Sequence, residues 1–308
     1  MLGYLCAYYR HYYPIEFTTA FLNDAANDED IKNGTEMAKQ YGITVSMPKW
    51  GLSKSNYFFT KEQNIITKGL ASVKYMSDSV ANELYNLANN KQYGTFVDVL
   101  KGIDTETSLN TRQLDILIKL DFFSTFGNQR ELLRISEIFF NWFKKGAAKQ
   151  IKRAVVDGTA FEKAVSAHAV GVTKAGAVSK SYTLLEPMAI CRDCELIIKN
   201  AGLEDLSVVM KAKNFSDAMG YSGYVSGKEE DRRKLFVKNI FPVSSRAGKQ
   251  FGYNVSTQSL GSGKDGKFTV YNREYNKDPI KKDDVIICKN YRRDRGYYIL
   301  SDYEHLYA

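Results

Sequence analysis

The spacing of apolar and polar residues changes once along this chain, near residue 221. Before that point apolar residues recur every three or four positions, which is typical of amphipathic helices. After it, apolar and polar residues alternate, as they do in strands. The pattern predicts a multidomain α+β protein, with an all-α N-terminal two-thirds and then a small antiparallel β-barrel. We expect a helical cluster over 1–42, a short β-hairpin with helix pairs over 43–133, a basic helical connector over 134–220 and a barrel over 221–308.

The first segment reads as three helices, over residues 2–13, 14–26 and 28–41. Tyr8, Tyr9 and Tyr12 lie at helical spacing in the first of them. Aromatic residues at this spacing more often pack than bind ligands, so we expect them to be packing residues.

The second segment contains a short β-hairpin, over residues 57–67, followed by two short helix pairs. Helices are expected over 69–73, 78–87, 95–101 and 111–120, with tight polar turns within each pair. A tight turn leaves the first amides of the following helix without intrahelical partners. Such amides can bind a phosphate oxygen without reading sequence. The tandem pairs therefore predict contact with a nucleic-acid backbone, although their use as packing modules alone stays open.

The third segment predicts a long amphipathic helix over 129–152, with a basic end that is favourable at a helix C-terminus. A helix is also expected over 157–168, and the glycine-containing stretch 170–182 reads as a linker. Two more helices follow, over 188–200 and 203–213.

Six strand candidates fill the last segment, over 222–227, 234–243, 249–258, 266–272, 283–291 and 296–302. Short strands of this number and spacing predict a small barrel, with the OB-fold as the leading candidate.

Composition narrows the class of protein. No run of about 18 apolar residues is present, so no membrane partner is expected. The N-terminal residues lack the features of a secretion signal. The four cysteines are few and scattered, which favours a cytoplasmic protein with free thiols.

The net charge of +8 is unevenly distributed. Residues 126–185 carry 10 basic and 4 acidic residues, and residues 221–308 carry 17 and 11. Basic segments interleaved with tyrosines suit a polyanion, through phosphate neutralisation and base stacking. A solvated basic surface is the alternative interpretation.

Candidate nucleic-acid contacts follow from these patterns. In the helix pairs they are Lys68, Lys74, Ser77, Arg112, Asn128 and Arg130. In the barrel they are Lys238, Arg246, Lys249, Tyr253, Lys267 and Tyr271. Because residues alternate between the two faces of a strand, we expect about half of the barrel's aromatic candidates to be core residues.

No catalytic centre is indicated. Cys191 and Cys194 have metal-ligand or redox spacing, but a structural zinc site needs about four ligands and no second such pair exists. No phosphate-binding Walker loop, nucleophile elbow or HExxH motif occurs.

The order of these segments resembles the C-terminal part of the bacterial DNA polymerase III alpha subunit. The likeness is carried by AYYRHYYPIEFTTAFLN (residues 7–23), by residues 41–60 and 65–84, and by LNTRQLDILIKLDFFSTFGNQRELL (residues 109–133). It implies the end of a fingers domain, tandem helix-hairpin-helix units and an OB domain. One departure is that Tyr75 and Ser77 stand where the family has turn glycines.

The resemblance implies a DNA-binding part of a replicative polymerase that grips duplex and single-stranded template DNA. The family's palm and PHP domains have no counterpart here, so we expect no activity from this chain alone. The catalytic Mg²⁺ would belong to the missing palm, and no cofactor is expected in this chain. An interaction module that docks on a separate catalytic subunit, or on a sliding clamp through residues 113–117, is the alternative.

Overall fold

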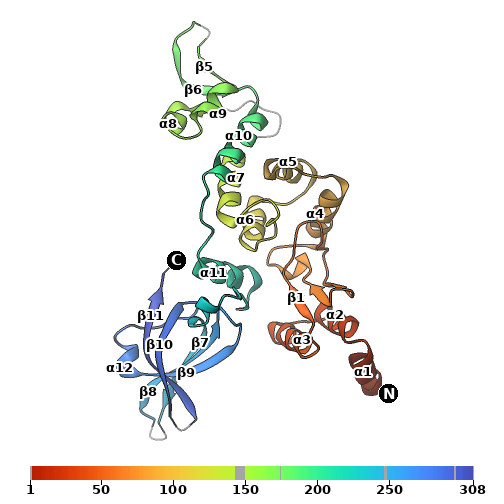
Figure 1. The fold of residues 1–308 in the computed structure, drawn as a ribbon, viewed down its shortest axis with the longest axis vertical. Helices are drawn as coiled ribbons and strands as arrows, with labels where there is room; N and C mark the ends of the chain where they lie inside the picture. Colours follow the sequence, from red (N-terminus) through yellow and green to blue (C-terminus); the bar gives the residue numbers. More distant parts are fainter. Residues whose placement is uncertain (1, 143–149, 174, 246–247, 295, 308) are drawn as a thin grey trace. The chain divides into compact units, whose positions relative to one another are not determined.

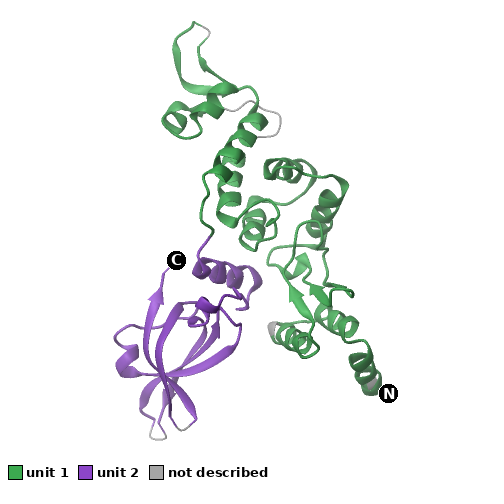
Figure 2. Cartoon of the chain, in the orientation of Figure 1, with its two compact units in different colours: residues 1–205 green, residues 206–308 purple. Residues whose placement is uncertain are grey.

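The computed structural model describes residues 2–142, 150–173, 175–245, 248–294 and 296–307 (Figure 1). The chain divides into two compact units, residues 1–205 and 206–308, which we describe separately (Figure 2). The finer division into four segments stays a prediction. None of the described helices has the length and apolar character that crossing a membrane requires.

The first unit begins with three helices, as predicted: α1 (Leu2–Tyr12), α2 (Pro14–Asn23) and α3 (Asp28–Gln40). A small sheet follows, formed by β1 (Thr44–Ser46), β2 (Phe58–Thr60) and β3 (Ile65–Thr67) in the order β1-β3-β2. The strands β2 and β3 form the predicted antiparallel hairpin. Residues from α2, α3 and the sheet share one small core, which includes Leu22, Ala38 and Ile66.

The predicted packing role of the α1 tyrosines is wrong. The helix is exposed along residues 3–12, and Tyr8, Tyr9 and Tyr12 are 40%, 51% and 63% exposed. Helical spacing identified a shared face, but spacing does not say whether another element covers that face.

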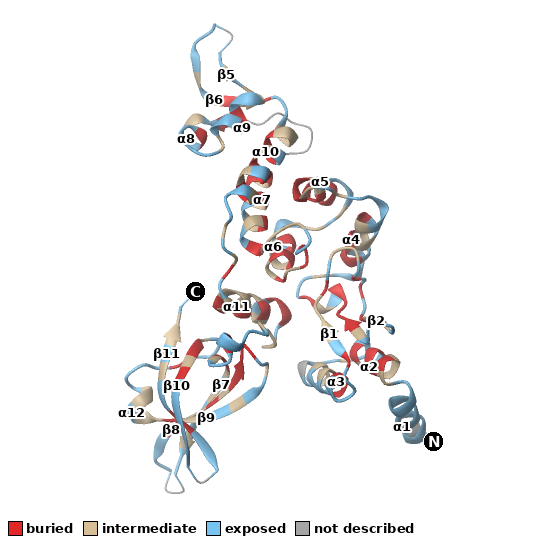
Figure 3. Cartoon of the chain, in the orientation of Figure 1, coloured by how far each residue is buried: buried red, intermediate tan, exposed pale blue. Residues whose placement is uncertain are grey.

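A larger core joins the helices of the tandem pairs (Figure 3). These elements are η1 (Leu70–Ser72), α4 (Asp78–Asn90), α5 (Phe96–Glu106), α6 (Thr111–Lys119), α7 (Gln129–Trp142) and α10 (Pro187–Asn200). Side chains at helical spacing fill the core, among them the fully buried Leu84, Phe96, Leu117 and Phe139. Together, η1 with α4 and α5 with α6 give the two predicted helix pairs.

A small β-containing insertion separates α7 from α10. It consists of β4 (Gln150–Lys152), α8 (Arg153–Val156), α9 (Glu162–Ala167), β5 (Ala169–Val172) and β6 (Val178–Leu184), with strand order β4-β6-β5. The N-terminal two-thirds is therefore not all-α. The predicted linker over 170–182 is instead most of a β-hairpin, and residues 150–152 of the predicted long helix are a strand. Residues 143–149 of that predicted helix lie outside the described residues.

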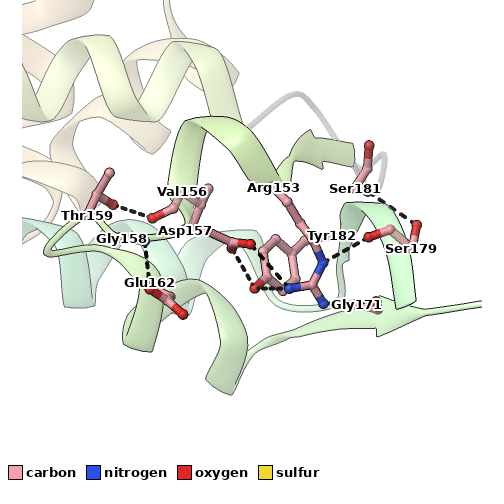
Figure 4. A network of polar contacts seen from close by, with 10 residues as sticks. All are labelled: Arg153, Val156, Asp157, Gly158, Thr159, Glu162, Gly171, Ser179, Ser181 and Tyr182. Atoms are coloured by element: carbon pink, nitrogen blue, oxygen red, sulfur yellow. Dashed lines mark hydrogen bonds and ion pairs between the residues drawn. The ribbon is translucent and has the colours of Figure 1, made fainter. Parts of the chain in front are cut away.

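Arg153 holds this insertion together (Figure 4). Its guanidinium donates hydrogen bonds to the Ser179 and Gly171 carbonyls at 2.8 and 3.0 Å and to the Tyr182 hydroxyl at 2.8 Å. The Tyr182 hydroxyl donates in turn to Asp157, at 2.9 Å. A Cβ at Gly171 would lie 2.4 Å from the guanidinium, so a larger residue there would displace the end of the Arg153 side chain.

The second unit is a closed five-stranded barrel with a helix packed on it. Its elements are α11 (Val208–Met219), η2 (Glu229–Asp231), β7 (Lys234–Ser244), β8 (Gln250–Ser259), β9 (Asp265–Tyr271), α12 (Asn272–Tyr275), β10 (Val285–Asp294) and β11 (Tyr297–Leu306). Val209 and Ala212 of α11 share a buried cluster with Phe236 of β7. The helix therefore belongs to the same compact unit as the barrel.

The predicted barrel is confirmed, with two differences. The strands close in the order β7-β8-β9-β11-β10, and β9 pairs with β11 in parallel while every other pair is antiparallel. The barrel is therefore mixed, and its topology is consistent with an OB domain. Residues 222–227 form no strand, because Tyr224 packs onto the cluster under α11 instead of continuing an alternating pattern.

Candidate nucleic-acid interface

The turn of the first helix pair lies between η1 and α4, at residues 74–77. Tyr75 has a φ of 67°, the left-handed conformation in which glycine is favoured, so a tyrosine occupies the position of a turn glycine. Ser77 accepts a hydrogen bond from the Val80 amide and caps α4. Within the described residues, no protein acceptor is found for the amides of Tyr75 and Ser77. These amides can therefore donate hydrogen bonds to a ligand oxygen.

Residues of the second pair lie against this turn. The Arg112 guanidinium lies 4.2 Å from the centre of the Tyr75 ring and donates to its hydroxyl at 2.9 Å. The Gln113 side chain donates to the Tyr75 carbonyl at 2.6 Å. The structure thus brings Arg112 to the turn that contains Lys74 and Ser77, and all three are exposed.

One carboxylate lies beside this turn. Asp78, the first residue of α4, accepts a hydrogen bond from the Ser55 hydroxyl. Its negative charge opposes phosphate binding, whereas Lys74 and Arg112 favour it. The local balance is one acidic group against two basic groups.

The turn of the second pair, residues 107–110, is saturated internally. The amides of Thr107, Leu109 and Asn110 donate to the Ile103 carbonyl, the Thr107 hydroxyl and the Gln113 side chain. The Ser108 amide and hydroxyl both donate to the Glu83 carboxylate, at 2.7 and 2.8 Å. These hydrogen bonds lower the pKa of Glu83, so its carboxylate is charged at neutral pH.

Two further helix N-termini are also occupied by carboxylates of the chain itself. The Phe96 and Val97 amides of α5 donate to Glu195, each at 2.9 Å, and this buried carboxylate pairs with Lys199 at 2.8 Å. The Gln129 amide of α7 donates to Asp205 at 3.1 Å. These two N-termini therefore serve packing within the protein, which agrees with the alternative that parts of the helix pairs are packing modules.

The other predicted contacts in this unit differ in accessibility. Lys68 is only 6% exposed, and burial lowers its pKa to about 8, so its ammonium does not lie on a surface that DNA could reach. Asn128 caps α7 by accepting from the Glu131 amide at 2.9 Å, and its amide group donates to the Leu203 carbonyl. Arg130 is exposed. Of these three, only Arg130 is available to a ligand.

The predicted barrel contacts also differ, since some are exposed and others pair with residues of the barrel. Lys249 and Lys267 are exposed, and Tyr271 is partly exposed. Lys238 pairs with Asp265 at 3.1 Å, and Tyr253 stacks on Tyr275 of α12 with ring centroids 3.8 Å apart. Arg246 lies outside the described residues.

The barrel also presents an aromatic and basic cluster around Phe268, and the predicted set omitted its exposed members Tyr291, Arg293 and Tyr298. Phe268, Tyr291 and Tyr298 contact one another edge-on, with centroids 5.8–6.3 Å apart, and Arg293 lies 5.9 Å from the Tyr298 ring. Tyr291 and Tyr298 are 54% and 44% exposed. Strand pairing assembles the cluster, since Tyr298 lies opposite both Arg293 and Phe268. The signal in the sequence was the run of tyrosines and arginines over 291–298.

The predicted clamp-binding peptide and the cysteine pair do not form accessible binding sites. Gln113, Leu114 and Leu117 are buried within α6, so residues 113–117 are not an accessible clamp-binding peptide. Cys191 and Cys194 are buried free thiols whose pKa burial raises to about 12. Within the described part of the chain, no three His, Cys, Asp or Glu side chains are grouped as metal ligands.

Residues 42–133 match the family model described as a helix-hairpin-helix motif. DNA polymerase III subunit alpha of Thermus aquaticus is 30% identical over 146 residues, which is 46% of this chain and 12% of that protein. The subunits of Treponema pallidum and Ureaplasma parvum are 29% and 24% identical over 134 and 144 residues, 43% and 45% of this chain. The matches span only 11–14% of the length of these relatives. The predicted resemblance is confirmed to this extent: the chain has the helix-hairpin-helix motif and partial similarity to these subunits.

Proposed function

We propose that this chain binds DNA as the C-terminal, DNA-holding part of a DNA polymerase III alpha-type replicative polymerase. The observation that carries the proposal lies inside the matched motif, where Lys74 and Arg112 flank a turn whose amides at Tyr75 and Ser77 are available. Backbone amides and cations together bind phosphate without reading the base sequence. In this role the first turn contacts the backbone of duplex DNA.

The barrel would hold single-stranded template. Exposed aromatic rings stack on bases of any sequence, and nearby cations neutralise the backbone. Tyr291, Tyr298 and Arg293 supply both, and Lys249 and Lys267 are exposed on the same unit. Nucleotidyl transfer and its Mg²⁺ would belong to a separate catalytic portion, in the cytoplasm, and this chain alone would extend no primer.

The test is DNA binding by the whole chain as a function of salt, measured by fluorescence anisotropy on a primer–template duplex. Each lost phosphate contact lowers the slope of log K against log salt by about 0.9. The variant K74A/R112A should therefore bind more weakly, with a slope smaller by up to about 2. The control K32A/K39A removes two lysines from α3 and should leave the slope unchanged. Wild-type protein without salt-dependent binding would contradict the proposed function.

A second candidate function is protein interaction. The helix α1 presents several aromatic side chains to solvent, among them Tyr4 and Tyr12, which are 74% and 63% exposed. Exposed aromatic surface of this kind often marks a protein interface. This surface suits docking on a separate catalytic polymerase subunit. Co-purification with such a subunit that is lost in the variant Y4A/Y12A would support this function over DNA binding.

A further inference from the structure

We propose that Glu83 occupies the phosphate position of the second hairpin turn and thereby keeps that turn from contacting DNA. The inference rests on the proposed function, because it concerns how many of the two turns grip the duplex. The two turns belong to one matched motif, yet among the described residues only the second turn has donors that bind a carboxylate, that of Glu83.

The contacts of Glu83 are those that a phosphate oxygen would make. One carboxylate oxygen accepts from the Ser108 amide and hydroxyl at 2.7 and 2.8 Å, and the other accepts from the Ser79 hydroxyl at 3.1 Å. An amide and a hydroxyl that converge on one anionic oxygen form a charge-assisted site, which binds either kind of anion. The carboxylate and a phosphate therefore compete for the same two donors.

Among the amides of residues 107–110, only that of Ser108 donates to an acceptor that a phosphate could replace. Thr107, Leu109 and Asn110 donate to a carbonyl, a hydroxyl and an amide oxygen, all of which are neutral acceptors and belong to the turn or its two flanking helices. Glu83 comes from α4, a different helix pair, and its side chain can move without unfolding the turn. Its retained negative charge would also repel an approaching phosphate.

The inference is tested by removing the carboxylate from the whole chain. E83A should bind primer–template duplex about three- to tenfold more tightly at low salt, with the slope of log K against log salt steeper by up to about 0.9, because a phosphate at this turn no longer faces the competing negative charge of Glu83. The matched control is D104A, which removes a carboxylate of α5 just before the same turn. Among the described residues Asp104 makes no hydrogen bond with Ser108. D104A should change affinity slightly and leave the slope as it is.

The outcomes separate the two proposals. Wild-type protein that shows no salt-dependent binding would contradict the proposed function. Wild-type binding with an unchanged slope in E83A overturns the inference alone. Thermal melting establishes that E83A is folded, and if it is not, E83Q replaces it and is expected to bind more tightly than wild type. Equal affinity of E83Q and wild type would then overturn the inference.

Discussion

Lys68 illustrates how far burial can change the role of a single residue. It immediately precedes the first helix pair, where a lysine would suit phosphate, but its side chain lies in the interior. Burial disfavours the charged ammonium and lowers its pKa from 10.5 to about 8. Near neutral pH the fold therefore carries the cost of a buried charge.

This cost gives stability a defined pH dependence. The unfolded chain keeps the Lys68 proton up to about pH 10.5, whereas the folded chain loses it near pH 8, so the unfolded state binds more protons between these values. The contribution of Lys68 to the free energy of unfolding should therefore rise with pH across this window, by about 3 kcal/mol at most, whereas the buried thiols of Cys191 and Cys194 act in the opposite sense above about pH 9. In denaturant titrations K68M should lack this contribution, so its free energy of unfolding relative to wild type should fall as pH rises from about 8 to 10.5. The exposed-lysine variant K74M should keep it, and identical pH profiles for K68M and wild type would contradict the prediction.

Tyr75 shows what the sequence could reveal about the candidate site. The absence of glycine at the first turn was visible in the sequence, where Tyr75 and Ser77 stand. The structure places Tyr75 in the glycine-like conformation, so the turn itself is retained. The contact of Arg112 with its ring joins residues 37 positions apart and could not be read from spacing.

At the scale of elements, local patterns predicted individual strands but not how the strands pair. Alternation identified the five barrel strands, because one face of each strand is buried. The parallel pairing of β9 with β11 depends on the path of the whole chain, which alternation does not encode. The hairpin of β5 and β6 was missed because its small residues and glycines resemble a linker, while its stabilising partner, Arg153, lies outside it.

The Arg153 network makes a prediction about this hairpin. R153M keeps the aliphatic stem of the side chain but leaves the Tyr182 hydroxyl and two carbonyls without their donor. Because Arg153 is partly exposed, we expect a loss of about 1–3 kcal/mol, concentrated in residues 150–186. Limited proteolysis should show faster cleavage between β5 and β6 than in wild type. The control R130M removes an exposed arginine of α7, and cleavage as fast in that variant as in R153M would contradict the prediction.

At the scale of the molecule, the two units present surfaces of different chemistry. The first unit provides amides and cations at one hairpin turn, which suit the regular backbone of a duplex. The second provides exposed rings beside arginine, which suit unstacked bases. The two sets of residues belong to different compact units, so their substitutions should act independently.

Substitutions in the aromatic cluster of the barrel test whether the two units bind DNA independently. Y291A/Y298A in the whole chain removes two exposed rings, and base stacking is worth about 1–3 kcal/mol per base. Affinity for a single-stranded oligonucleotide should therefore fall at least about tenfold, while the salt slope on fully duplex DNA stays that of wild type. Y307A removes a tyrosine that is 81% exposed beyond β11 and serves as the matched control. Equal losses on single-stranded and duplex DNA would mean that the cluster supports the fold and not a single-strand site, because stacking requires bases that are free to unstack.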